Sequence, residues 1–227
     1  MSLRLVVLIS GSGSNLQAIL DACGQNPSAP PAAALDARVV GVLSNRADAY
    51  GLTRAADAGV PTALLSHRDY ADREGFDQAM IGVIDAWQPD VIILAGFMRI
   101  LTPGFVGHYS GRLINIHPSL LPRHKGLDTH QRALDAGDAE HGCSVHYVTA
   151  ELDGGPVIAQ AILRVKAQDT ADTLTQRVHA LEHRLYPAVI GWLAEGRLSC
   201  LAGQPLLTPL LDGHPLTAPL RLTEESA

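Results

Sequence analysis

Short apolar runs alternate with amphipathic segments along this chain, and the pattern predicts an α/β protein with a mostly parallel sheet flanked by helices. The run 90–95 is almost continuously apolar, as in a central strand buried on both faces, and it stops at Gly96. Phe76, Met80 and Ile84 fall at helical spacing, which predicts a helix over 72–87 with one apolar face. The other strands are expected at 3–10, 39–43, 62–65, 113–117, 144–148 and 157–165, and the other helices at 15–23, 50–59, 129–135 and from about Thr170 onward.

Three segments depart from this alternation. The Pro- and Ala-rich stretch 26–37 predicts a surface loop, and Asp212-Gly213 predicts a hairpin turn ahead of a polar tail. Pro187 should interrupt or kink the last long helix, because proline removes a backbone donor. The chain is expected to form one Rossmann-like domain over 1–227, with two halves that meet near residue 100 and a tail over 201–227.

Composition excludes several classes of protein. With 227 residues, 47% of them hydrophobic, the chain can bury a large core. A net charge of −6 argues against sequence-independent binding of nucleic acid, because such binding depends on positive side chains that neutralise phosphates. No stretch is long enough to cross a membrane and the first residues run into a strand, so a cytoplasmic protein is expected. Three cysteines without Cys-x-x-Cys spacing (Cys23, Cys143 and Cys200) indicate free thiols.

Asn115 and His117 are candidate chemical groups at the end of a predicted strand. The two-residue period of a strand puts both side chains on one face, and Pro118 ends the strand. An amide and an imidazole can both donate to a carbonyl oxygen that becomes negative during attack. A buried polar pair with only a structural role is the alternative for these two residues taken alone.

A second candidate is the glycine-rich turn 10–15, between the first strand and the first helix. Its glycines permit close approach of an anion, and a helix N-terminus offers free N–H groups to a phosphate. Leu16 stands where a dinucleotide fingerprint has its third glycine, and no Gly-Lys-Ser/Thr follows as in a P-loop. A monophosphate is therefore the expected ligand, and a tight turn without chemical role is the alternative.

The histidines and serines give weaker signals. Five histidines cluster in sequence without the His-x-x-x-His spacing of a zinc site, so no metal is expected. Ser119 lacks the Gly-x-Ser-x-Gly elbow of a nucleophile. The clustered histidines are His117, His124, His130, His141 and His146, and a position at the surface or a helix end is expected for His108, His141 and His183.

Four motifs together resemble the folate-dependent phosphoribosylglycinamide formyltransferases, over the chain from Leu5 to about Arg197. The resemblance implies the formyltransferase fold, with a nucleotide-binding half over about 1–100 and a folate and catalytic half over about 101–200. The motif Asn-x-His-Pro-Ser-Leu-Leu-Pro is shared by transferases and hydrolases that use formyltetrahydrofolate, whereas the glycine turn points to a ribonucleotide. The four motifs lie at 7–17, 94–101, 115–122 and 151–158.

The resemblance also implies a role for particular residues. The glycinamide amine would attack the formyl carbon of 10-formyltetrahydrofolate while two catalytic side chains hold the oxygen and a third tunes the histidine and helps relay protons. The implied catalytic residues are Asn115, His117 and Asp153. The implied contacts to glycinamide ribonucleotide are Gly13, Ser14, Asn15, His179, Ala180, Leu181 and Glu182. The implied contacts to folate are Arg73, Met98, Arg99, Ile100, Leu101, Asn115, Thr149, Ala150, Glu151, Leu152 and Asp153.

The chain departs from the family pattern at a few positions. Asp128 stands where many members carry histidine, Ala150 where an acid is usual, and His179 where glutamine is frequent. A formyltetrahydrofolate hydrolase, which resembles a longer chain with an N-terminal regulatory domain, is one alternative function. A non-catalytic folate or nucleotide sensor is another. Neither a nucleic acid nor a membrane is an expected partner, and the oligomeric state stays open, with a homodimer among the expected assemblies.

Overall fold

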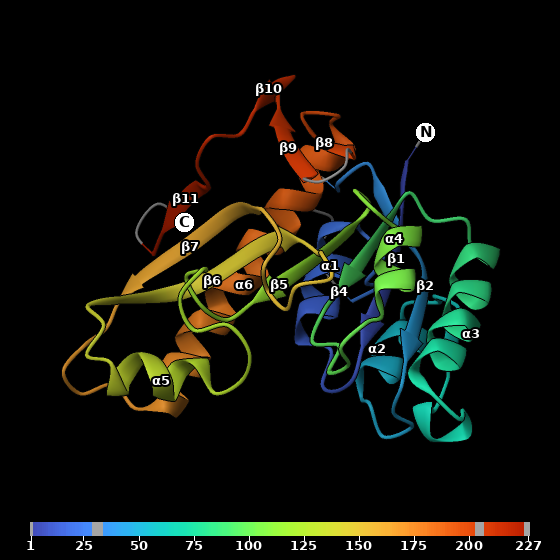
Figure 1. The fold of residues 1–227 in the computed structure, drawn as a ribbon, viewed down its shortest axis with the longest axis horizontal. Helices are drawn as coiled ribbons and strands as arrows, with labels where there is room; N and C mark the ends of the chain where they lie inside the picture. The colour runs from blue at the N-terminus through green and yellow to red at the C-terminus, as the bar shows by residue number, and fades with distance from the viewer. Residues whose placement is uncertain (1, 29–33, 203–206, 225–227) are drawn as a thin grey trace.

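The computed structural model describes residues 2–28, 34–202 and 207–224 and contains a central eight-stranded sheet (Figure 1). Its strand order is β11-β7-β6-β5-β4-β1-β2-β3. All neighbouring pairs are parallel except the two that β6 makes, so the expected mostly parallel sheet is confirmed. The strands are β1 Leu3–Ile9, β2 Ala37–Ser44, β3 Thr62–Leu64, β4 Val91–Leu94, β5 Leu113–His117, β6 Glu140–Tyr147, β7 Val157–Arg164 and β11 Leu220–Thr223.

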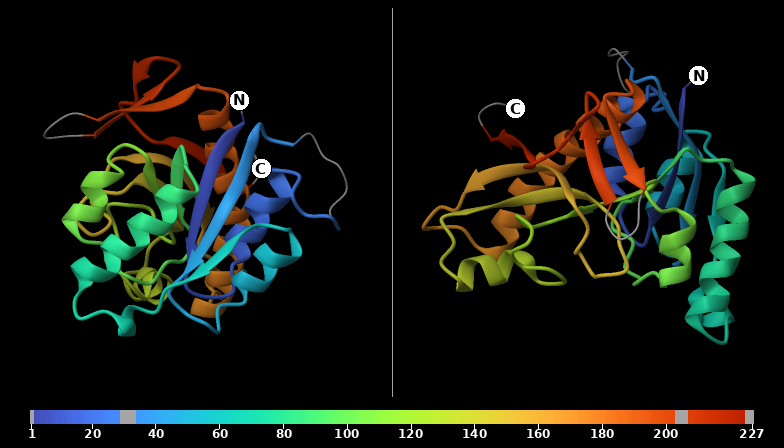
Figure 2. Two further views of the ribbon diagram at one scale, coloured as in Figure 1. Left: turned by 90° about the vertical axis from the view of Figure 1, so that its right-hand side faces the viewer. Right: turned by 45° about the horizontal axis from the view of Figure 1, so that its top comes forward.

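Helices cover both faces of this sheet, as Figure 2 shows. On one face the apolar residues of α1, α2 and α6 pack against the strands, and on the other those of α3 and α4 do so. Among the described residues, no helix is both long and apolar enough to cross a membrane. The helices are α1 Ser14–Ala22, α2 Gly51–Asp57, α3 Arg73–Ala86, α4 Pro103–His108, α5 Thr129–Asp135 and α6 Ala171–Ala194, with a short 3₁₀ helix at His67–Asp69.

Of the two outcomes predicted for Pro187, an interruption of the last helix is wrong, because α6 runs as one helix from Ala171 to Ala194. Proline 187 lacks only the N–H that would bond to the carbonyl of His183. Leu185 and Val189, on either side of the proline, are fully buried in the core. Packing of this face therefore holds the helix together through the proline.

Two further elements differ from the expected ones. Strand β6 starts at Glu140 rather than at residue 144, because its first residues pair with the end of β7. Gly142 permits this pairing, since a Cβ there would lie 1.9 Å from the carbonyl oxygen of Ala161. Helix α4 was not expected, although Thr102 caps it and Pro103 occupies its first turn.

The C-terminal region forms a small antiparallel sheet and then rejoins the large one. Strands β8 (Leu198–Ala202), β9 (Leu207–Leu211) and β10 (His214–Pro215) form the three-stranded sheet. The predicted hairpin at Asp212-Gly213 is confirmed, with φ of 49° and 82° at the two turn residues. Strand β11 then pairs with β7 at the edge of the large sheet. Residues 29–33 of the expected loop, and 203–206 and 225–227 of the expected tail, lie outside the described residues.

The sheet has a topological switch point at β1. Strand β1 pairs with β2 on one side and with β4 on the other. The chain therefore adds β2 and β3 on one side of β1 and then crosses back to add β4 and β5 on the other side. The loops that follow β1 and β4 diverge there and leave a crevice at the carboxyl ends of the strands. Ligands of open α/β sheets bind in such a crevice.

Candidate active site

A cavity of about 270 Å³ occupies this crevice. Its walls come from the turn after β1, the loop after β4, the end of β5 and the inner face of α6. Five of the seven residues expected to contact a ribonucleotide line it. The lining consists of Ser10, Gly11, Ser12, Gly13, Ser14, Asn15, Ala95, Gly96, Met98, Ile116, Pro118, His130, His179 and Glu182.

The turn after β1 holds its backbone close to a neighbouring helix. Gly13 precedes α1 with φ of 70°, a left-handed conformation that glycine adopts without strain. A Cβ at Gly13 would lie 2.6 Å from the Cα of Gly51, at the start of α2. The N-terminus of α1 therefore opens into the cavity with free N–H groups, which is the arrangement that binds phosphate.

A buried carboxylate faces the same cavity from α6. Glu182 is 4% exposed and accepts a hydrogen bond of 2.8 Å from the side-chain nitrogen of Asn15. Burial raises the pKa of Glu182, against the lowering effect of that hydrogen bond. The side-chain oxygen of Asn15 is buried without a partner. Two acceptors are thus available in the cavity for hydroxyl groups of a ligand.

His130 is a cavity residue that the resemblance did not imply. It lies in the first turn of α5, and its Nδ1 is 3.0 Å from Nε2 of His141. Burial, and then the nearby His179 and His117, lower the pKa of His130. The first turn of α5 thus brings an uncharged imidazole to the ribonucleotide side of the site.

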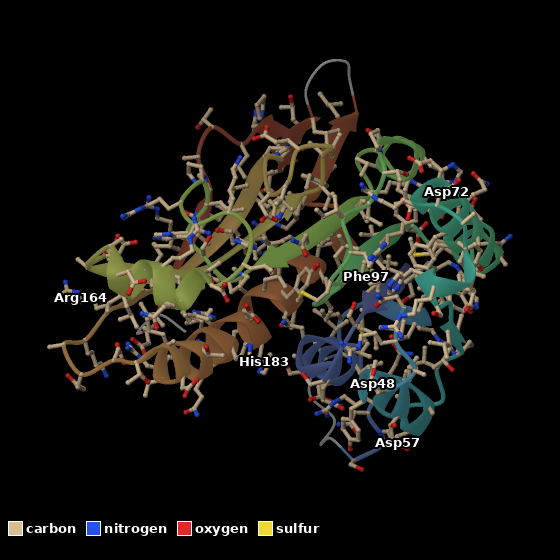
Figure 3. The ribbon with its side chains drawn as sticks, turned by 60° about the horizontal axis from the view of Figure 1, so that its bottom comes forward. Asp48, Asp57, Asp72, Phe97, Arg164 and His183 are labelled. Atoms are coloured by element: carbon tan, nitrogen blue, oxygen red, sulfur yellow. The ribbon has the colours of Figure 1, made fainter. Side chains whose placement is uncertain are left out.

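A second cavity, of about 110 Å³, lies beside the first. Along β5 and the loop after β4, successive residues line different cavities: Asn115 lines the second and Ile116 the first, and Phe97 the second and Met98 the first. Figure 3 labels Phe97 in this loop. The second cavity is lined by Leu94, Phe97, Arg99, Ile100, Leu101, Val106, Asn115, His146, Val148, Thr149, Ala150, Glu151, Leu152 and Asp153.

Most of the residues expected to contact folate therefore gather in one place. Arg73 does not line this cavity; its guanidinium donates to the carbonyl of Ile100 at 2.8 Å and so holds the loop that does. Ser10 ties the turn after β1 to the loop after β4 within the first cavity, because its hydroxyl donates to Asn45 at 2.6 Å and accepts from the backbone N–H of Met98 at 2.8 Å.

The three expected catalytic residues lie together at the end of β5. Nδ1 of His117 is 3.5 Å from a carboxylate oxygen of Asp153, and each of these side chains is 8% exposed. Asn115 lines the second cavity one strand period before His117. Asp153 has φ of 47°, a left-handed conformation that aspartate tolerates better than most residues. Asn115 and Asp153 thus line the second cavity, and His117 lies behind Asp153 without lining either cavity.

A polar loop closes over this trio. Nε2 of His117 donates to the backbone carbonyl of His124 at 3.0 Å, and the N–H of Gly126 donates to Asp153 at 2.9 Å. Asp138 fixes the loop through Nε2 of His124, at 2.7 Å, and through Arg123. Both ring nitrogens of His117 face oxygen acceptors, an arrangement that suits an imidazolium.

Some residues predicted from the sequence to contact a ligand lie outside the two cavities. Ala180 is exposed and Leu181 lies in the apolar core, so neither lines a cavity. His141 is buried, not at the surface as expected, and His183 lies within α6, where Figure 3 labels it. His108 does end α4, as expected. Among the described residues, no group of three metal-ligating side chains could hold a metal ion.

Comparison with known proteins identifies the family of the chain. The profile of a family described as Formyl transferase matches residues 3–190. The chain belongs to this formyl transferase family. It is 56% identical, over 196 residues that make up 86% of this chain and 89% of the other, to the phosphoribosylglycinamide formyltransferase of Escherichia coli (strain K12). It is 43% identical to that of Haemophilus influenzae over 195 residues, which are 86% of this chain and 89% of the other.

Solved structures of formyl transferases agree as well. The phosphoribosylglycinamide formyltransferase of Coxiella burnetii superposes with a TM-score of 0.87 at 50% identity, over 97% of this chain and all (100%) of that one. The resemblance inferred from the four motifs, and the formyltransferase fold that it implies, are therefore confirmed.

Proposed function

We propose that the protein transfers the formyl group of 10-formyltetrahydrofolate to the amine of glycinamide ribonucleotide, in de novo purine biosynthesis. One observation carries this proposal: two cavities of different character lie on either side of β5, and the side chains of Asn115, His117 and Asp153 gather at the end of that strand.

The first cavity suits glycinamide ribonucleotide. The turn at Gly13 and the N-terminus of α1 bind the phosphate through backbone N–H groups. Glu182 and the unpaired oxygen of Asn15 accept hydrogen bonds from the ribose hydroxyls. His179 lies on the exposed face of α6 at the rim of the cavity, near the ribose.

The second cavity suits the pterin end of a folate. Leu94, Phe97 and Leu101 give it an apolar floor, and the loop 149–153 supplies backbone donors and acceptors at its edge. Met98 and Ile100 are 66% and 60% exposed beside it and can cover the remainder of a bound folate. Arg73 keeps the loop after β4 in place through its bond to the carbonyl of Ile100.

The catalytic residues act on the formyl group where the two ligands meet. The glycinamide amine attacks the formyl carbon, forming a new C–N bond, while Asn115 donates to the oxygen that becomes negative. His117 donates to the same oxygen through Nε2, which exchanges the carbonyl of His124 for it. Asp153 stabilises the charged imidazole through its 3.5 Å contact. The C–N bond to tetrahydrofolate then breaks, and the proton lost by the amine reaches the leaving nitrogen through His117, Asp153 and water.

Free thiols support a cytoplasmic location. Cys23 and Cys143 are buried and Cys200 is half-buried, and all three are unpaired. Unpaired cysteines persist where the environment keeps thiols reduced. The acidic net charge of −6 likewise supports small-molecule substrates rather than nucleic acid as partners.

A turnover assay tests the proposal. Purified protein is incubated with 10-formyltetrahydrofolate, with and without glycinamide ribonucleotide, and the release of tetrahydrofolate is followed. Release should require the ribonucleotide and should persist in a chelator, because the nucleophile is the substrate amine. Equal release without the ribonucleotide would identify a hydrolase. Binding of both ligands without release would identify a sensor. Activity lost in chelator and restored by a divalent cation would refute the metal-free mechanism.

A further inference from the structure

His146 lies beside Asn115 in a position fixed by the sheet. It is the residue of β6 directly opposite Asn115 in the antiparallel pairing with β5. Side chains of such a pair project on the same face of a sheet and touch. The side-chain nitrogen of Asn115 is 3.1 Å from Nε2 of His146, and both residues line the second cavity.

A second contact determines which nitrogen of His146 carries the proton. Nδ1 is 2.9 Å from the backbone carbonyl of Tyr147, which can only accept, so Nδ1 is the donor. Burial lowers the pKa of His146 by more than the bond to the Tyr147 carbonyl and the nearby Asp153 raise it, and His117 and Lys125 add to the lowering. Near neutral pH the ring is therefore uncharged, and Nε2 is a bare acceptor.

An acceptor at this point fixes the orientation of the Asn115 amide. The nitrogen of the amide must face Nε2, because its oxygen would meet another lone pair. One amide hydrogen is then used by His146 and the second is free. We propose that His146 is a positioning residue, which holds the second amide hydrogen of Asn115 toward the formyl oxygen in the second cavity. This inference rests on the proposed role of Asn115 as a donor to that oxygen.

Protonation of His146 would reverse this arrangement. Nε2 would become a donor, and the amide of Asn115 would turn its oxygen toward the ring. The formyl oxygen would then lose one donor. Asp153, with an oxygen 3.8 Å from Nε2, together with His117 and Lys125, are the charged or titratable groups that face the ring. A fall in kcat in acid, below pH 6.5, is the expected sign of this change.

Two substitutions separate positioning from a merely structural role. In His146→Asn the shorter amide keeps a donor at the place of Nδ1, for the carbonyl of Tyr147, but supplies no acceptor at the place of Nε2. In His146→Gln the longer amide reaches the place of Nε2 and returns an oxygen acceptor to Asn115. Loss of one oxyanion donor costs about 10²–10³ in kcat. We expect His146→Asn to lower kcat about tenfold to hundredfold with little change in folate KM, and His146→Gln to recover most of it.

His141→Asn is the matched control. His141 is also a buried histidine of β6, but its ring contacts His130 rather than Asn115. The kcat of His141→Asn should stay near that of the wild type, because any effect through His130 falls on the KM for glycinamide ribonucleotide. Thermal unfolding should show that all variants are folded. If His146→Asn does not fold, His146→Gln carries the test through its pH profile, since glutamine does not titrate and the acid fall in kcat should disappear.

A double-mutant cycle with Asn115→Ala decides between the proposals. If His146 acts through Asn115, then His146→Asn should cost nothing more in the Asn115→Ala background. An unchanged kcat in Asn115→Ala would refute the proposed role of Asn115 itself. A reduced kcat in Asn115→Ala, with equal losses for His146→Asn in both backgrounds or none in either, would overturn the positioning role alone. Equal losses in the Asn and Gln variants of His146 would overturn it as well.

Discussion

Replacing Asp153 by asparagine tests how much of the rate depends on the carboxylate beside His117. The two groups are 3.5 Å apart and each side chain is 8% exposed, so water screens them weakly. Unit charges at this distance attract by roughly 5 kcal/mol at an effective dielectric constant of about 20. Since about 1.4 kcal/mol corresponds to a tenfold change in rate, kcat should fall by up to about three orders of magnitude. The asparagine keeps an oxygen that can accept from Gly126, so the loop over the site should stay in place.

The assay measures kcat and the KM of both substrates at neutral pH. Folate KM should change little, because the loss falls on the charged imidazole that forms during the reaction. Asp169→Asn is the control: its side chain is 5% exposed and lies 2.6 Å from Arg177, and neither residue lines a cavity. A folded Asp153→Asn enzyme with near wild-type kcat, or an equal loss in the control, would refute the reasoning.

Three other substitutions have expected outcomes. Gly13→Val should raise the KM for glycinamide ribonucleotide far more than that for folate, since its Cβ would lie 2.6 Å from the Cα of Gly51; an unchanged KM in a folded variant would mean that the turn has no ligand. Burial lowers the pKa of His141 to about 4 from 6.5, so its contribution to stability is complete above pH 6.5 and is lost as the pH falls toward 4. His141→Gln should therefore flatten the free energy of unfolding in urea over that range, by up to roughly 3 kcal/mol, and an unaltered pH dependence would contradict this. Gly155→Ala should lower the free energy of unfolding, measured with urea, by at least about 2 kcal/mol, because its Cβ would lie 1.8 Å from the carbonyl oxygen of Tyr147. A stability equal to that of the wild type would show that the backbone at the end of β6 shifts to make room for the Cβ.

The elements with a strong local pattern could be predicted from the sequence. The apolar run before Gly96 became β4, and α5 and β5 have the bounds expected for them. The elements that depend on distant partners could not. The first residues of β6 are polar, and only pairing with β7 makes them a strand. Strand β11 has four residues and exists because the edge of β7 is available to it. The continuity of α6 through Pro187 depends on packing against the core, which cannot be predicted from the residues next to the proline.

The candidate site divides in the same way. The two-residue period placed Asn115 and His117 on one face, and the glycine turn marked the first cavity. The proximity of Asp153 came only from the resemblance, because it depends on how the loop after β6 folds back. The sequence marked His130 and His146 only as members of a histidine cluster without metal spacing. Their places in the site depend on how α5 lies against the crevice and on the register of β6.

The hydrogen bond between Asn15 and Glu182 joins residues 167 positions apart. A ribosome synthesises the chain from the N-terminus, so the turn at Gly13 emerges long before the helix that completes its cavity. Until α6 docks on α1, the nascent protein has half of a ribonucleotide cavity and an uncovered core face. Contacts of such long range form late and slowly in folding. We therefore expect a chain that is truncated before α6 to stay unfolded and be degraded, and not to bind the ribonucleotide with half of the cavity.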